Sequence, residues 1–205
     1  MENIERTYWE RNITFIAGVD EAGRGSLAGP VVAAAVIFDS SHSFIEGVDD
    51  SKKLTPKKRE KLYDVIINSA RAVGVGIVEP TEIDCINILQ ATYKAMHSAV
   101  ETLSVSPEYA LIDGNGTPHL KCPCTPVIKG DARVYSIAAA SIIAKVTRDR
   151  IMTEYDALYP QYGFKNNKGY GSKYHRDAIC TFGLSPLHRA TFCRKLLQTQ
   201  IELLK

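Results

Sequence analysis

The chain begins its first apolar run at Thr14-Phe-Ile-Ala-Gly-Val19, turns through Ala22-Gly-Arg-Gly-Ser-Leu-Ala-Gly-Pro30, and continues in Val31-Val-Ala-Ala-Ala-Val-Ile-Phe38. Short runs rich in β-branched and aromatic residues, bounded by glycine and proline, are typical of β-strands. The sequence therefore predicts two strands, Thr14–Val19 and Val31–Phe38, that form a hairpin around a glycine-rich turn.

Helical and strand patterns alternate along the rest of the chain. Thr55 followed by Pro56 predicts a helix start, and Thr81-Glu-Ile-Asp84 resembles a capping box with Asp in place of Glu. The small residues of Ile137-Ala-Ala-Ala-Ser-Ile-Ile-Ala144 would let a helix pack closely on a sheet. The predicted helices cover Thr55–Ala70, Thr81–Thr102, Ser136–Tyr155, Lys173–Phe182 and Pro186–Leu204, and the further strands cover Ala72–Val78, Tyr109–Ile112 and Pro126–Ile128.

This order favours an α/β fold with a mixed β-sheet flanked by helices, in which helical crossovers join the later strands. The chain becomes polar and loop-like after Pro160. The last two helices are expected to form a small C-terminal helical appendage, residues 173–205, packed on a main domain of residues 1–172.

Composition restricts the class of protein. With 205 residues, 45% of them hydrophobic, the chain can bury a core, and its net charge of +2 permits nucleic-acid binding where positive charge is concentrated. No run reaches the ~20 apolar residues of a membrane span, and Met1–Arg11 lacks the apolar core of a signal peptide, so a cytoplasmic protein is expected. Five cysteines favour reduced thiols, and Cys122-Pro-Cys124 lacks an evident fourth ligand for zinc.

Four acidic residues stand beside apolar segments. Asp20 and Glu21 follow the first predicted strand, Asp113 follows a later one, and Asp131 precedes the most apolar helix. Buried carboxylates need partners, and hard divalent cations such as Mg²⁺ prefer oxygen ligands of this kind. Helix capping or salt bridges are the alternative for each residue alone, and spacing by itself does not bring Asp113 and Asp131 to Asp20.

Six sequence blocks resemble the ribonuclease HII family. They are Val19-Asp-Glu-Ala-Gly-Arg-Gly-Ser-Leu-Ala-Gly-Pro30, Asp50-Ser-Lys-Lys-Leu54, Leu111-Ile-Asp-Gly114, Lys129-Gly-Asp131, Ser136-Ile-Ala-Ala-Ala-Ser-Ile-Ile-Ala-Lys-Val146 and Lys168-Gly-Tyr-Gly171. The resemblance extends over nearly the whole chain.

The resemblance implies a ribonuclease H-like fold and an endonuclease that acts as a monomer. It would hydrolyse the RNA strand of RNA–DNA hybrids and cut ribonucleotide-containing duplex DNA at single ribonucleotides, leaving 5′-phosphate and 3′-hydroxyl ends. The implied catalytic and metal-binding residues are Asp20, Glu21, Asp113 and Asp131, which would hold two Mg²⁺ or Mn²⁺ ions.

The same resemblance implies the nucleic-acid-binding residues. The backbone of Gly23, Arg24 and Gly25 would contact the ribose 2′-hydroxyl, which distinguishes RNA from DNA at one position. Tyr170 would stack on the deoxyribose that follows the ribonucleotide. Ser51, Lys52 and Lys53 begin the densest positive cluster of the chain and would lie along the phosphate backbone.

Other cationic residues have alternative roles. Lys57, Lys58, Arg59 and Lys61 extend the cluster, and whether they reach nucleic acid stays open. Lys145, Arg148 and Arg150 either contact phosphate or form salt bridges with Asp149 or Glu154. The five histidines have no metal-ligand spacing, which favours surface or packing roles.

Three rival functions would each require different features of the sequence. A ribonuclease HIII would carry an additional N-terminal domain, for which the nineteen residues before Asp20 leave no room. A noncatalytic nucleic-acid-binding module of the same fold would not need all four acidic residues. A metal-dependent phosphatase acting on small molecules would not need the lysine cluster. A clamp-binding peptide is not expected at the C-terminus, because Gln198–Leu204 lacks its aromatic pair.

Overall fold

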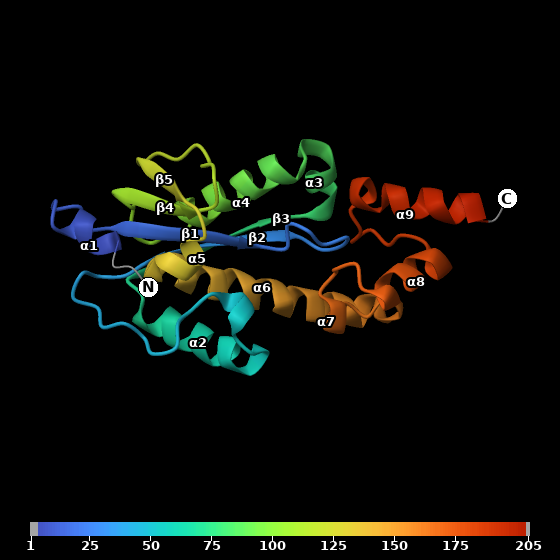
Figure 1. Cartoon of the computed structure of the whole chain (residues 1–205), viewed down its shortest axis with the longest axis horizontal. Helices are drawn as coiled ribbons and strands as arrows, with labels where there is room; N and C mark the ends of the chain where they lie inside the picture. The colour runs from blue at the N-terminus through green and yellow to red at the C-terminus, as the bar shows by residue number, and fades with distance from the viewer. Residues whose placement is uncertain (1–3, 204–205) are drawn as a thin grey trace.

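The computed structural model describes residues 4–203 and contains one five-stranded sheet (Figure 1). Its strands are β1 Ile16–Ala22, β2 Val31–Ile37, β3 Ala72–Val78, β4 Tyr109–Asp113 and β5 Cys124–Val127, in the order β3-β2-β1-β4-β5. The β1–β2 and β2–β3 pairs are antiparallel, whereas β1–β4 and β4–β5 are parallel. The predicted mixed sheet and its opening hairpin are confirmed.

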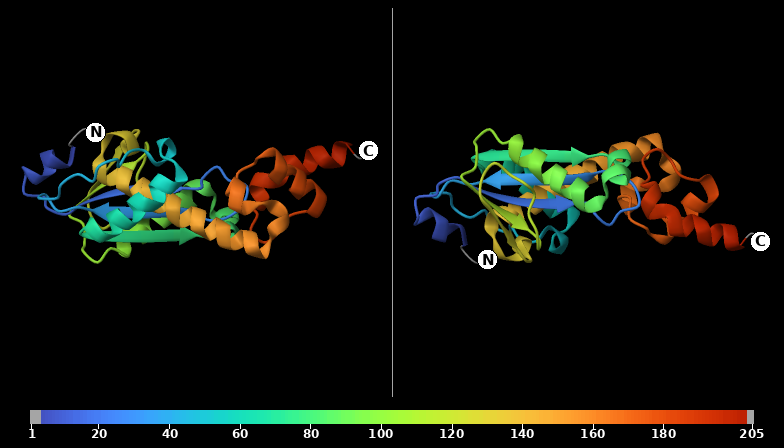
Figure 2. Two further views of the ribbon diagram at one scale, coloured as in Figure 1. Left: turned by 90° about the horizontal axis from the view of Figure 1, so that it is seen from below. Right: turned by 90° about the horizontal axis from the view of Figure 1, so that it is seen from above.

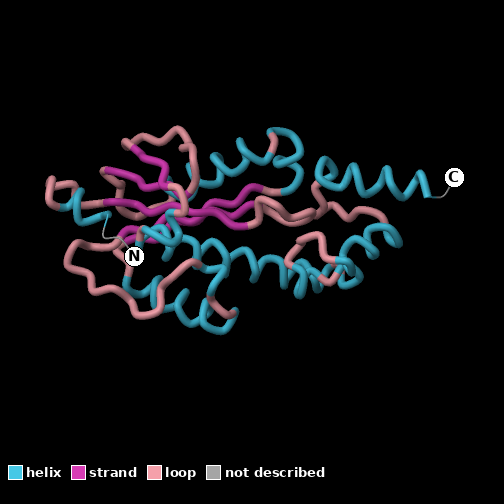
Figure 3. The backbone as a smooth tube through the Cα atoms, in the orientation of Figure 1, coloured by secondary structure: helices cyan, strands magenta, loops and turns pink. Residues whose placement is uncertain are grey.

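Helices cover both faces of the sheet, which lies between them as one layer (Figure 3). The helical segments are α1 Ile4–Trp9, η1 Ser51–Lys53, α2 Pro56–Ser69, α3 Pro80–Ile86, α4 Ile88–Glu101, α5 Gly130–Arg133, α6 Tyr135–Leu158, η2 Pro160–Tyr162, α7 Phe164–Asn167, α8 Lys173–Phe182 and α9 Ala190–Leu203. α3 and α4 lie on one face, and α2 and α6 lie on the other (Figure 1).

Helix α6 packs closely on β1, as its small residues predicted. Ile137, Ala140 and Ala144 are fully buried. A Cβ added to Gly18 would lie 2.3 Å from the backbone carbonyl carbon of Ser136, so a side chain larger than hydrogen has no room there. Glycine in the strand and small residues in the helix thus set the distance between the two layers.

The predicted continuous helix Thr81–Thr102 is wrong, because Asn87 separates α3 from α4. Asn87 has a φ of 68°, and its side chain caps α4 by accepting hydrogen bonds from the backbone N–H groups of Leu89 and Gln90. The predicted capping box is wrong as well, since α3 starts at Pro80. Asp84 instead accepts hydrogen bonds from the N–H groups of Ala190 and Thr191 at the start of α9.

Several predicted boundaries shift. Pairing with β2 continues through Asp20 and Glu21 as far as Ala22, so β1 ends three residues after the predicted Val19. β5 starts at Cys124 and not at Pro126, and α6 extends beyond its predicted limits at both ends. The segment after Pro160 is not only loop, because it contains η2 and α7. Helix α9 starts at Ala190, four residues later than predicted, and its predicted end at Leu204 is outside the described residues.

The C-terminal helices form one end of the molecule, far from α1 (Figure 2). Ile179 of α8 and Cys193 of α9 pack with Tyr162, Phe164 and Met152 in a separate apolar cluster. This cluster joins the C-terminal helices to the end of α6. Within the described part of the chain, no helix is long and apolar enough to cross a membrane.

Gly18→Ala is expected to lower the free energy of unfolding by about 1–3 kcal/mol, because the added methyl group pushes α6 away from β1. Urea denaturation followed by circular dichroism measures the change. Gly25→Ala is the matched control, since a Cβ at Gly25 would meet no atom within 4 Å. Equal stability of the Gly18 variant and the wild-type protein would contradict the close packing.

Candidate active site

Three aspartates from separate elements meet at one point of the sheet. Asp20 lies in β1, Asp113 ends β4, and Asp131 lies in α5. One carboxylate oxygen from each lies within 4.8 Å of the others. The structure thus brings together three of the four predicted acids, which spacing alone did not place together.

Strand pairing explains the convergence. The parallel register sets Val19 opposite Ile112, so Asp20 and Asp113 follow on neighbouring strands. After β5, Lys129 takes a left-handed conformation with a φ of 55°, which turns the chain back toward Asp113. The N–H of Gly130 then donates to Asp113 Oδ1 at 2.7 Å.

The cluster is electrostatically unfavourable on its own. Asp20 and Asp131 are 4% and 6% exposed. Burial raises the pKa of Asp20 well above its ordinary value, and the charges of Glu21 and Asp113 raise it further. Burial and the charge of Asp131 also raise the pKa of Asp113. Bringing these carboxylates together therefore calls for a cation.

Lys52 supplies one positive charge to the cluster. Its Nζ lies 2.9 Å from Asp131 Oδ2, while most of the lysine side chain is exposed. Burial of the ammonium lowers the pKa of Lys52, but the hydrogen bond to Asp131 and the nearby carboxylates outweigh this effect and raise it. Lys52 alone faces three carboxylates, so the positive charge that it brings is not enough to balance them.

Glu21 lies beside the three-aspartate cluster but is not part of it. Arg24 Nη1 lies 3.5 Å from Glu21 Oε1. Burial raises the pKa of Glu21 although Arg24 lowers it, and Asp113 adds to the raising. Glu21 therefore lies close enough to Asp113 to be repelled by its negative charge, while its carboxylate contacts Arg24.

The donor set fits a hard divalent cation. Asp20 Oδ1 accepts from the N–H of Glu21 at 2.7 Å, and Gly130 holds one oxygen of Asp113, so backbone groups orient both carboxylates. Oxygen ligands with restrained orientation and excess negative charge are what Mg²⁺ and Mn²⁺ bind. Cys122 and Cys124 belong to no metal-type cluster among the residues that the structure describes.

The glycine-rich turn is held by two fully buried arginines, Arg148 and Arg189, for which the sequence did not predict this role. Arg189 donates to the carbonyls of Gly23, Arg24 and Gly29 at 2.8–3.0 Å. Gly23 has a φ of 93°, and a Cβ there would lie 2.0 Å from Arg148 Nε.

Arg148 joins this turn to the segment before Tyr170. It donates to the carbonyls of Pro30, Ala28 and Lys168 and to Ser26 Oγ. The available sequence signal was its place on the buried face of α6, at helical spacing from Ala144 and Met152. Arg148 therefore takes neither of its two predicted roles.

Tyr170 has a restrained backbone and is 38% exposed. Arg148 Cζ and Lys145 Nζ lie 5.5 and 5.8 Å from the ring centroid. His175 Nδ1 donates to the Tyr170 carbonyl at 2.9 Å, and His175 Nε2 lies 3.1 Å from Nε2 of the buried His188. The packing role expected for the histidines thus applies to these two, which support the Tyr170 loop.

The predicted cationic segment divides into different contacts. Ser51 is buried, and its N–H donates to Ser141 Oγ at 3.3 Å. Lys53 Nζ lies 3.2 Å from Asp49 instead of facing the aspartates. Arg59 donates to the carbonyls of Ser51 and Leu54 and so fixes η1, the element that carries Lys52.

Comparison with known proteins gives one consistent family. The family model described as Ribonuclease HII matches residues 17–195. The chain is 52% identical over 200 residues to the ribonuclease HII of Syntrophus aciditrophicus, covering 98% of this chain and 94% of the relative. It is 57% identical over 182 residues to that of Geobacter sulfurreducens, covering 89% and 83%.

The fold is similar to a solved structure as well. The crystal structure of the ribonuclease H2 from Pyrococcus horikoshii OT3 superposes with a TM-score of 0.75 at 32% sequence identity, covering 92% of this chain and 99% of that chain. The predicted ribonuclease H-like fold is confirmed.

Asp20→Asn is expected to stabilise the metal-free protein at pH 7, because it removes one of the repelling charges. Since the pKa of Asp20 is raised in the folded state, the folded wild type binds more protons than the unfolded chain above the ordinary carboxyl pKa. The stability of the wild type should therefore fall as the pH rises from the ordinary carboxyl pKa to the raised pKa of Asp20. The stability of the variant should fall less over the same range.

Urea denaturation at several pH values, with and without Mg²⁺ or Mn²⁺, measures both effects. The wild type should gain more stability from the ion than Asp20→Asn does. Glu46→Gln, a change at an exposed acid, is the control. A variant that is less stable than the wild type without metal would show that the aspartates do not repel one another as described.

Proposed function

Because the chain belongs to the ribonuclease HII family and is a ribonuclease H type endoribonuclease, we propose that it cuts duplex DNA at single embedded ribonucleotides as well as the RNA strand of RNA–DNA hybrids. The observation that carries the proposal is the three-aspartate cluster beside the Gly23–Gly25 turn. A carboxylate cluster supplies a place for metal-assisted phosphodiester hydrolysis, and a nearby turn supplies a reader for the sugar.

Asp20, Glu21, Asp113 and Asp131 would hold two Mg²⁺ or Mn²⁺ ions. When bound, such ions stabilise the charge of a phosphodiester under attack and favour deprotonation of water, which leaves 5′-phosphate and 3′-hydroxyl ends. Glu21 would exchange its contact with Arg24 for this role. The exposed ammonium of Lys52 would then serve the substrate phosphate instead of Asp131.

The Gly23–Gly25 turn would read the 2′-hydroxyl through its backbone. Arg189 already occupies the carbonyls of Gly23 and Arg24. The N–H groups of Arg24 and Gly25 donate to no backbone or side-chain acceptor within the described residues. Two free donors on a turn that buried arginines hold in place suit a hydroxyl oxygen. The absence of a side chain on Gly25 lets a sugar come close.

Tyr170 would place its ring against the deoxyribose that follows the ribonucleotide. Tyr170 is partly exposed, and Arg148 and Lys145 lie 5.5 and 5.8 Å from the centroid of its ring. A ribose at that position would bring a second 2′-hydroxyl against the ring, so the enzyme should prefer junctions where RNA gives way to DNA.

The cytoplasmic location, the monomeric state, and the division into residues 1–172 and 173–205 stay predictions.

The proposed function is tested with three duplexes that carry one ribonucleotide, an RNA–DNA hybrid strand, or DNA alone. The wild type should cut the first two only when Mg²⁺ or Mn²⁺ is present, and leave the third intact. Asp20→Asn should lose more than about 90% of cleavage, roughly 1.4 kcal/mol of barrier, and keep its affinity for the duplex. Binding without cleavage by the wild type would favour the noncatalytic module.

Tyr170→Ala is expected to reduce cutting at a single ribonucleotide by roughly ten-fold or more, with a smaller loss on long hybrids. The reason is that truncation removes the ring that would contact the sugar. Tyr170→Phe is the control, because it keeps the ring and should retain most of the activity. Initial rates on both substrates measure the effect. Equal losses of Tyr170→Ala on both would assign the junction preference to another residue.

A further inference from the structure

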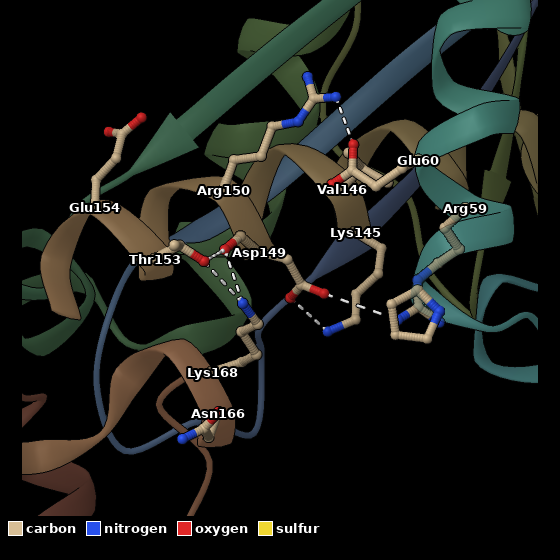
Figure 4. A pocket seen from close by; sticks show the side chains of 11 residues that line it. Arg59, Glu60, Lys145, Val146, Asp149, Arg150, Thr153, Glu154, Asn166 and Lys168 are labelled. Atoms are coloured by element: carbon tan, nitrogen blue, oxygen red, sulfur yellow. Dashed lines mark hydrogen bonds and ion pairs between the residues drawn. The ribbon is translucent and has the colours of Figure 1, made fainter.

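A groove of about 580 Å³ lies between the start of α2 and the middle of α6 (Figure 4). Four basic side chains line it, together with three acidic ones. The basic residues are Arg59, Lys145, Arg150 and Lys168, and the acidic residues are Glu60, Asp149 and Glu154. The lining thus carries more positive than negative charge.

The positive charge gathers around one carboxylate. Lys145 Nζ lies 2.7 Å from Asp149 Oδ1, and Arg59 Nη2 lies 3.9 Å from Asp149 Oδ2 (Figure 4). Lys168 Nζ donates to the Asp149 backbone carbonyl at 3.1 Å and to Thr153 Oγ1 at 3.0 Å. Asp149 therefore lies among three cationic side chains, those of Lys145, Arg59 and Lys168.

Arg150 forms a separate ion pair with Glu60, in which its Nη2 lies 2.5 Å from Glu60 Oε2. Burial lowers the pKa of Lys168; Asp149 and Asp156 oppose this, whereas the charges of Lys145 and Arg148 lower the pKa further. An additional anion among these side chains would relieve their mutual repulsion.

The groove adjoins the residue that would contact the substrate sugar. Lys145 lies 5.8 Å from the centroid of the Tyr170 ring, and Lys168 precedes Tyr170 by two residues. A nucleic-acid strand whose sugar rests on Tyr170 would therefore carry a neighbouring phosphate past Lys145.

We propose that this α2–α6 groove binds a backbone phosphate of the DNA next to the ribonucleotide, through Lys145, Lys168 and Arg59. In this proposal, which rests on the proposed function, Asp149 holds the cations in place in the free protein and competes with the phosphate for them. The contact is to the backbone, so it adds affinity for any duplex without selecting the ribonucleotide.

A purely structural salt-bridge network is the alternative, and the two hypotheses predict different DNA affinities for Asp149→Asn. If Lys145 and Arg59 serve only to stabilise the fold through Asp149, then Asp149→Asn lowers stability and leaves DNA affinity unchanged. If a phosphate binds there, Asp149→Asn removes its competitor. That variant should bind duplex DNA more tightly and with a steeper dependence on salt.

The experiment measures binding of a fluorescent DNA duplex without a ribonucleotide, in EDTA, at KCl concentrations from 50 to 200 mM. Each phosphate contact contributes a slope of about 0.9 in log affinity against log salt. Lys145→Ala should lose about that much slope, so that over this range its affinity falls roughly three-fold less than that of the wild type. Lys145→Arg should restore the slope.

Lys94→Ala is the matched control, because Lys94 pairs with Glu82 near α4 on the opposite face of the sheet. It should bind like the wild type. Thermal unfolding of every variant checks the fold, and if Asp149→Asn does not fold, the two Lys145 variants carry the test. An unchanged slope of log affinity against log salt in Lys145→Ala would contradict phosphate binding in the groove. Unchanged DNA affinity in a folded Asp149→Asn would contradict it as well. Cleavage is measured separately. If the wild type does not cleave but the variants show these changes in binding, the proposed function is rejected and phosphate binding in the groove is supported.

Discussion

Repulsion among three aspartate carboxylates, held with oxygens within 4.8 Å of one another, is the constraint on which the rest of the site depends. Like charges this close and this buried separate unless the backbone prevents it. Parallel pairing of β1 with β4 fixes two of them, and the N–H of Gly130 ties Asp113 to the segment that carries Asp131. Lys52, delivered by η1, partly neutralises the cluster from the solvent side.

Two buried arginines fix the positions of the segments that would meet substrate. Arg189, just before α9, holds the carbonyls of the Gly23–Gly25 turn, and Arg148 of α6 links that turn to the Lys168–Tyr170 segment. Burial lowers the pKa of Arg189 to about 9, and the charge of Arg148 adds to the lowering. The cost of burying two cations is offset by several carbonyl partners each. The C-terminal helices and the sheet thereby form one framework for the two segments that would contact the substrate sugars.

The sequence predicted the elements whose signals are local. Gly29 and Pro30 mark the start of β2, and the small residues of α6 predict its close packing. The break at Asn87 was missed because apolar residues recur at helical spacing on both sides of it, while a single positive φ leaves no pattern. Arg148 and Arg189 bind backbone carbonyls, which every residue carries, so residue types do not reveal their partners, although helical spacing places Arg148 on the buried face of α6. The separation of Glu21 from the aspartates depends on a side-chain contact with Arg24 that spacing does not predict.

An anomalous difference map from crystals grown with Mn²⁺ and a duplex that carries one ribonucleotide would show whether these four acids hold metal. We expect two peaks among Asp20, Glu21, Asp113 and Asp131, with Glu21 turned away from Arg24 and Lys52 released from Asp131. Peaks elsewhere, or a cluster that keeps its contacts with Lys52 and Arg24 and holds no ion when the duplex is bound, would contradict this expectation.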